Sequence, residues 1–238
     1  MVLPTYSIIF AVAYICVMIS YFFSETSGNF KRRAINKITL ASMFWFYALI
    51  EMIRLGGFST LYFMLFIGIT FSYWGDIWLL WDFTKGGIVF AVGNVIIAGF
   101  IVAYMTQLGV PFLSYWWALI LIGLFVGLFI ILYKKGFYKH LKPPFVYAFV
   151  PYILSVSAHG CLSLVLIFVT SSLVKGNPQF ATQLAFLFFG SMLFMISDYF
   201  IAWHNFRDKY NKAILRLNSG TYFTGLLLIV LSFTLFLK

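Results

Sequence analysis

Two aspartates are the residues of this sequence best placed to do chemistry. Asp76 and Asp198 each lie inside a long apolar stretch, and an ionisable side chain at membrane depth is costly enough to be a functional candidate by default. Two carboxyl groups in one apolar pocket cannot both ionise easily, so one can donate a proton while the other acts as a base or a stabilising anion. We therefore predict that the two aspartates share a polar pocket in which these roles could be divided, with the assignment of acid and base left open. The alternative is that each aspartate only bonds a neighbouring helix.

The two aspartates have similar surroundings in the sequence. A glycine lies eight residues before each aspartate, and a tryptophan lies five residues after it. The glycines are Gly68 and Gly190, and the tryptophans are Trp81 and Trp203. This pattern indicates two parallel four-helix halves, and a chance match in an aromatic-rich sequence is the other interpretation.

Further polar residues are expected close to the two aspartates. Ser72 lies four residues before Asp76 and shares its helix face, and small or polar stripes of this kind face the interior of a membrane bundle. Lys37, Asn94 and Tyr222 fall at a similar depth, and together with Ser72 they are predicted to bind the substrate. The alternatives are that Lys37 extends to the membrane surface and that Tyr222 belongs to an aromatic belt.

The other ionisable residues have simpler interpretations. Glu51 lies three residues before Arg54, where a helical ion pair would neutralise it. His159 lies deeper than the predicted pocket and is interpreted as a structural hydrogen-bonding residue. The remaining acidic residues fall in loops or at their edges, and they are Glu25, Asp82 and Asp208.

The composition requires helices that cross a membrane. Of the 238 residues, 63% are hydrophobic and only 9% are charged, with a mean hydropathy of +1.00. These values exclude a soluble globule, and apolar blocks of about twenty residues exclude a membrane β-barrel. The predicted fold is an all-α, polytopic bundle of eight transmembrane helices in a single domain, residues 1–238. The predicted spans are 7–23, 37–53, 57–80, 86–107, 111–133, 146–174, 181–203 and 221–237.

The basic residues are divided unequally between the two sides of these spans. The connectors after the first, third, fifth and seventh spans carry thirteen of the sixteen Lys and Arg residues, which predicts that this side is cytoplasmic and that both termini are not. The formal charge of +10 therefore reflects topology and attraction to anionic lipid, and no nucleic-acid partner is expected. Short connectors without a eukaryotic sorting signal favour a bacterial inner membrane.

No motif for a metal or cofactor is found in the sequence. There is no HExxH and no Cys/His cluster with ligand spacing, and there is no GxSxG turn of a serine hydrolase. The two cysteines, Cys16 and Cys161, lie within separate apolar blocks. We predict a site without metal or cofactor, and the oligomeric state is left open.

Several short motifs together resemble the lysoplasmalogenase (YhhN-like) integral membrane family. The first is Gly68-x-x-x-Ser72-x-x-Gly75-Asp76, followed by Gly87-x-x-Phe90; the second is Gly190-x-x-x-Phe194-x-x-Ser197-Asp198; the third is Thr221-Tyr222-Phe223. Lys37 stands where the family has a Lys-Pro pair. The order and spacing of these motifs cover most of the chain, including the eight spans.

The resemblance implies a membrane hydrolase. Proteins of this family cleave the vinyl ether bond of lysoplasmalogens to a fatty aldehyde and a glycerophospho-ethanolamine or -choline. By carry-over, Asp76 and Asp198 are the catalytic pair, Lys37 and Tyr222 are pocket residues, and the partners are a lysophospholipid and the bilayer. A transporter or receptor for lipids or small molecules, or a family member without this activity, is the alternative.

Three positions depart from the family pattern. Asn94 stands where the family usually has His, Leu226 where it usually has Gln or His, and Ile38 where it has Pro. The loss of His bears most directly on activity, because Asn hydrogen-bonds but does not shuttle protons at neutral pH.

Overall fold

The structure, a computed structural model, describes residues 3–59, 61–136, 143–171, 176–206 and 211–236. Within these ranges the chain forms eight α-helices and two short 3₁₀ turns, η1 (Gly57–Ser59) and η2 (Phe112–Ser114). The α-helices are α1 (Thr5–Glu25), α2 (Phe30–Arg54), α3 (Tyr62–Trp78), α4 (Phe83–Gln107), α5 (Trp117–Lys134), α6 (Pro143–Val169), α8 (Pro178–Phe206) and α9 (Lys212–Thr234). The predicted all-α bundle is confirmed.

Each of the eight predicted spans overlaps one of these helices. Six of them, α1, α4, α5, α6, α8 and α9, are by length and composition suited to cross a membrane. The other two are less typical spans, because α3 has only 17 residues and α2 carries basic residues in its first turns and Glu51 and Arg54 near its end. The protein is a polytopic helical membrane bundle.

Two helices begin well before the apolar blocks that predicted them. The side chain of Asn29 accepts a hydrogen bond from the backbone N–H of Arg32 at the start of α2. Asn211 likewise accepts from the N–H groups of Ala213 and Ile214 at the start of α9. Such N-caps satisfy backbone donors outside the apolar region, so the helices extend into polar sequence that hydropathy alone assigns to loops.

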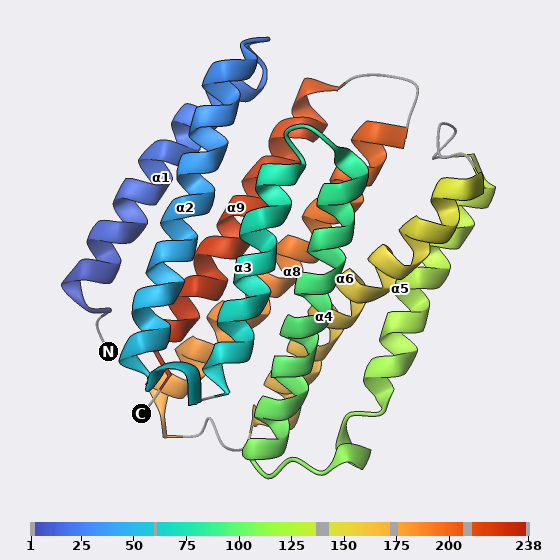
Figure 1. Ribbon diagram of the computed structural model, residues 1–238. Helices are drawn as coiled ribbons and strands as arrows, with labels where there is room; N and C mark the ends of the chain where they lie inside the picture. The colour runs from blue at the N-terminus through green and yellow to red at the C-terminus, as the bar shows by residue number, and fades with distance from the viewer. Residues whose placement is uncertain (1–2, 60, 137–142, 172–175, 207–210, 237–238) are drawn as a thin grey trace.

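A third cap lies at the same end of the bundle. Asp82 Oδ1 accepts hydrogen bonds from the N–H groups of Lys85 and Thr84, each at 3.0 Å, where α4 begins. The hydrogen bond from the Lys85 N–H, which stabilises the carboxylate, lowers the pKa of Asp82. The starts of α2, α4 and α9 thus lie together, at the end of the bundle opposite the two termini (Figure 1).

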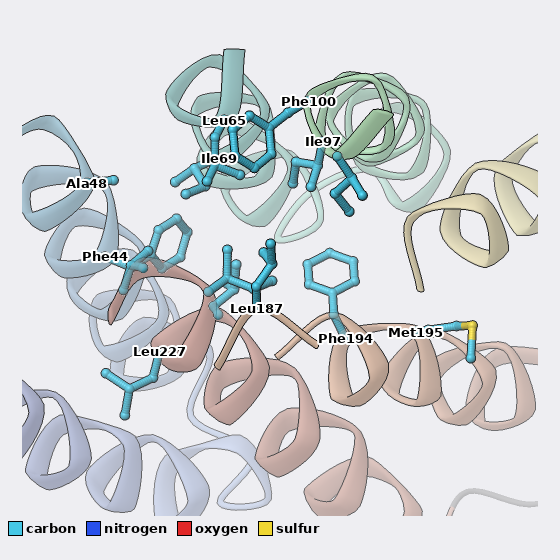
Figure 2. Close-up of a cluster of buried hydrophobic side chains, with 14 of the residues drawn as sticks. Phe44, Ala48, Leu65, Ile69, Ile97, Phe100, Leu187, Phe194, Met195 and Leu227 are labelled. Atoms are coloured by element: carbon cyan, nitrogen blue, oxygen red, sulfur yellow. The ribbon is translucent and has the colours of Figure 1, made fainter. Parts of the chain in front are cut away.

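The core forms between α2, α3, α4, α8 and α9, whereas α5 packs mainly on α6 at the edge (Figure 1). Buried apolar side chains from these helices meet in the centre of the bundle (Figure 2). They include Phe44, Leu65, Ile97, Leu187, Phe194 and Leu227. This core holds the helix ends that carry the polar residues in fixed positions.

Two helix pairs approach each other at glycines. A Cβ at residue 68 would lie 3.2 Å from the carbonyl oxygen of Gly93, so α3 and α4 are in close contact there. A Cβ at residue 190 would lie only 2.7 Å from the carbonyl oxygen of Gly225, between α8 and α9. The glycine that precedes each aspartate in sequence therefore serves the same packing role in both pairs, which supports the interpretation of two related halves.

The end of the bundle near the termini is closed by a separate polar cluster. The predicted pair of Glu51 and Arg54 is present, with Arg54 Nε 2.6 Å from Glu51 Oε2. Arg54 also donates to the carbonyl oxygens of Phe233 and Thr234 at the end of α9, and Tyr6 donates to Glu51. These contacts neutralise the buried carboxylate and satisfy carbonyl groups of the last turn.

Candidate active site

A cavity of about 860 Å³ opens among the helix ends opposite the termini. Its wall is formed by the ends of α1, α3 and α8 and by the starts of α2, α4, α6 and α9, since these helices alternate in direction. The polar lining residues include Glu25, Arg33, Lys37, Asp76, Tyr152, Asp198, Asn218, Ser219 and Tyr222. Four of the six predicted site residues, Lys37, Asp76, Asp198 and Tyr222, therefore line the same cavity.

The carboxyl group of Asp76 contacts one charged and one neutral polar side chain. Its side chain is on α3, and the residue is only 1% exposed. Lys37 Nζ of α2 lies 3.1 Å from Oδ1, and the Tyr222 hydroxyl of α9 donates to Oδ2 at 2.7 Å. A buried carboxylate with a lysine and a hydroxyl donor is stabilised in its charged form.

Asp198 has a different set of partners. The residue lies on α8 and is 6% exposed. The Tyr152 hydroxyl of α6 donates to Oδ1 at 2.7 Å. The other oxygen, Oδ2, is buried and has no hydrogen-bond partner among the residues that the structure describes. Asp198 therefore has one buried oxygen without a hydrogen-bond donor, a position that a proton on the carboxyl group could occupy.

Aromatic rings from α4 and α9 form one part of the cavity lining, which is called the floor here. Phe90 and Tyr222 line it, with ring centroids 5.8 Å apart at a near-perpendicular angle, and Phe194 packs against both rings from below. The glycine at position 75 makes room for this floor, because a Cβ there would lie 2.7 Å from the Phe90 ring. The floor is apolar and complements a hydrocarbon chain.

The other two predicted substrate-binding residues are not among those that line the cavity. Ser72 donates to the carbonyl oxygen of Gly68 one turn earlier in α3. Asn94 lies one turn beyond Phe90 in α4, where its Oδ1 is 3.0 Å from His159 Nδ1. His159 Nε2 in turn lies 2.9 Å from Ser191 Oγ. Asn94 and His159 thus link α4, α6 and α8 beneath the cavity, and the role predicted for Ser72 and Asn94 stays a prediction.

The sequence-based prediction missed several lining residues with close polar contacts, among them Glu25, Tyr152 and Ser219. Glu25 was assigned to a loop, but it is the last residue of α1, is buried, and lines the cavity. Tyr152 was not singled out, because one tyrosine among fifteen in an apolar sequence carries no signal of its partner. The position of Ser219 within α9 could have been predicted from the sequence. Asn211 is a favourable N-cap residue, so it indicates that the helix begins before Ser219.

The comparison with protein families agrees with these observations. A sequence model of the YhhN family matches residues 32–233, a region that includes both aspartates, Lys37 and Tyr222. No curated protein and no solved structure matches the chain. The resemblance to YhhN-like proteins is confirmed, and the chain belongs to the YhhN family.

Proposed function

We propose that this protein is a membrane hydrolase that cleaves the vinyl ether bond of lysoplasmalogen lipids. The observation that carries the proposal is that two buried aspartates with unequal partners line the same cavity. Asp76 is paired with Lys37, whereas Asp198 has a neutral tyrosine and one open oxygen. Acid-catalysed hydrolysis of a vinyl ether requires this combination of a proton donor and an anion, in parallel with glycoside hydrolysis.

The unequal partners assign the two roles. An adjacent lysine favours the carboxylate form, so Asp76 is the anion. Asp198 lacks a cationic partner among the described residues, and a second negative charge in the same apolar cavity would be unfavourable. Asp198 is therefore the acid, with its proton on Oδ2, where it faces no competing hydrogen bond.

The reaction proceeds in three balanced steps. Asp198 donates its proton to the vinyl carbon that does not carry oxygen, which leaves an oxocarbenium ion. Water then attacks the carbon next to oxygen and gives its proton to Asp76, which forms a hemiacetal. As the hemiacetal collapses, its hydroxyl proton passes to Asp198 and Asp76 protonates the departing glycerol oxygen. The products are a fatty aldehyde and a glycerophospho-alcohol, and both carboxyl groups return to their starting state.

The position of the cavity suits a single-chain lipid. The lining residues all belong to one end of the bundle, which lies near the headgroup level if the helices span the bilayer. A lipid headgroup would occupy the polar rim near Arg33 and Asn218, while the chain would lie over Phe90 and Phe223. The lining is thus polar where the headgroup would lie and apolar where the chain would lie, which matches the two parts of a lysophospholipid.

The test is an assay with purified protein in detergent. Lysoplasmalogen is supplied and fatty aldehyde is measured for the wild type, Asp198→Asn and Asp76→Asn. We expect aldehyde from the wild type and a loss of at least about a hundredfold in kcat for each variant, the usual contribution of an acid or base. Asp82→Asn is the matched control, because it removes a carboxylate at the same end while Asn still caps α4.

The outcomes separate the hydrolase from a transporter. No aldehyde from a folded wild type would overturn the proposal, and a gradient-dependent flux of lipid across vesicles would then favour transport. Equal rates for the wild type and both aspartate variants would also contradict it, because the assigned acid and base would then be unnecessary.

A further inference from the structure

Glu25 is a third buried carboxylate on the cavity wall, and the proposed reaction does not use it. The residue is only 6% exposed. Its Oε1 accepts hydrogen bonds from the hydroxyl groups of Tyr21 and Ser219. Its Oε2 is buried and has no hydrogen-bond partner among the described residues. Burying a carboxylate oxygen without a donor is costly, so this oxygen points to a donor supplied by a ligand.

Basic residues also line the cavity that Glu25 lines. Arg33 and Lys37 lie one helical turn apart on α2 and both line the cavity. Lys37 contacts Asp76 rather than Glu25, and within the described part of the chain Glu25 has no ion-pair partner. Arg33 and Glu25 lie close enough to interact electrostatically, but neither is in an ion pair among the described residues. Arg33 can therefore bind an anionic ligand group and Glu25 a cationic one.

We propose that Glu25 binds the primary ammonium group of an ethanolamine headgroup, with the adjoining phosphate at Arg33. A phosphate and an ammonium joined by two carbons match the pairing of a cation and a carboxylate on one wall. This inference rests on the proposed function for the identity of the lipid and adds the residue that selects its headgroup.

The geometry favours a primary over a quaternary ammonium. The open Oε2 of Glu25 is a hydrogen-bond acceptor, and Ser219 and Asn218 add polar atoms beside it on α9. A primary ammonium has three N–H donors, whereas a trimethylated one has none and relies on aromatic faces. Glu25 is therefore a specificity-determining residue for ethanolamine over choline.

The test measures binding rather than turnover. The probes are lysolipids with a saturated ether in place of the vinyl ether, which the proposed reaction cannot cleave, carrying ethanolamine, choline or a bare phosphate. We expect the wild type to bind the ethanolamine lipid about tenfold more tightly than the bare phosphate lipid, as for one charge-assisted hydrogen bond. Glu25→Gln should abolish this preference, and Asp82→Asn should keep it.

Two further measurements keep the result interpretable. Glu25→Gln retains an oxygen for Tyr21 and Ser219, so an unchanged melting temperature will show that the fold is intact. If this variant does not fold, an N-acetyl-ethanolamine lipid, which lacks the ammonium charge, replaces it as the probe of the wild type. Weaker binding of the acetylated lipid supports the proposal.

The failure of this inference differs from that of the proposed function. Equal affinities of the wild type for the three headgroups, or a preference that survives in Glu25→Gln, would overturn the ammonium site even if aldehyde is produced. A Glu25-dependent preference without aldehyde production would support the site and contradict only the hydrolase.

Discussion

At the scale of single residues, the ion pair between Lys37 and Asp76 combines two roles. Its charges are almost fully withdrawn from water, with side-chain exposures of 13% and 1%. Breaking such a pair leaves an uncompensated charge, whereas replacing both partners can be neutral. Stability and catalysis can therefore be separated by one double-mutant experiment.

The single change Lys37→Met should destabilise the protein by about 3 kcal/mol, because Asp76 is left without its cation. The double variant with Lys37→Met and Asp76→Asn should recover most of this stability while it stays inactive. Thermal unfolding in detergent and the aldehyde assay measure the two effects. If the double variant is as unstable as Lys37→Met, the unpaired charge of Asp76 is not the cause of the lost stability.

Tyr222 provides a second prediction at this scale. Tyr222→Phe keeps the ring that packs on Phe90 but removes the hydroxyl that donates to Asp76. The loss of one hydrogen bond to a charged group should lower kcat about tenfold, with little change in KM. The matched control is Tyr104→Phe, which breaks a hydrogen bond to Gln183 away from the cavity. Equal effects in both variants would indicate a general loss of stability.

At the scale of the helices, close backbone contact sets the positions of the two aspartates. Gly190 lies two turns before Asp198 on α8, and it meets Gly225 of α9, which lies one turn beyond Tyr222. The same arrangement brings Gly68 of α3 to Gly93 of α4. Small residues at such crossings allow helices to approach in a membrane, where packing drives their association.

Gly225→Ala should therefore be destabilising by about 1–3 kcal/mol, the usual cost of overpacking. Its Cβ would lie 2.7 Å from the carbonyl oxygen of Gly190 and 2.9 Å from the N of Phe194, and neither backbone atom can move easily. Gly123→Ala on α5 is the matched control, because nothing lies within 4 Å of its Cβ position. Thermal unfolding distinguishes them, and equal melting temperatures would contradict the tight crossing.

At the scale of the whole molecule, the basic residues predict which end faces the cytoplasm. The cavity lies at the end where α2, α4 and α9 begin and where most Lys and Arg residues stand in the sequence. We accordingly propose that the site opens toward the cytoplasmic leaflet and that both termini lie on the other side.

Cysteine labelling tests this orientation. In a background with Cys16 and Cys161 replaced by Ala, Lys135→Cys and Leu113→Cys place single thiols at opposite ends of α5. A membrane-impermeant maleimide should label position 113 in intact cells and position 135 only after permeabilisation. The reverse pattern would place the cavity on the outer face and contradict the charge-based orientation.

Much of the architecture was predictable because it depends on local properties of the sequence. Apolar blocks long enough to cross a bilayer predicted all eight helices, and the cost of a buried charge identified Asp76 and Asp198. The helix starts were predicted less well, because a cap such as Asn211 acts through a local hydrogen bond that hydropathy does not detect.

The sequence by itself thus determined the membrane bundle, its eight helices and the two carboxyl groups. Only the tertiary structure decided their partners, because a helix that is apolar all round does not reveal which face meets its neighbour. Packing brought Tyr152 to Asp198 and Lys37 to Asp76, and it directed Asn94 to His159. It also turned Glu25 from an expected loop residue into part of the cavity wall, because the rotation of α1 against α9 depends on contacts far apart in sequence.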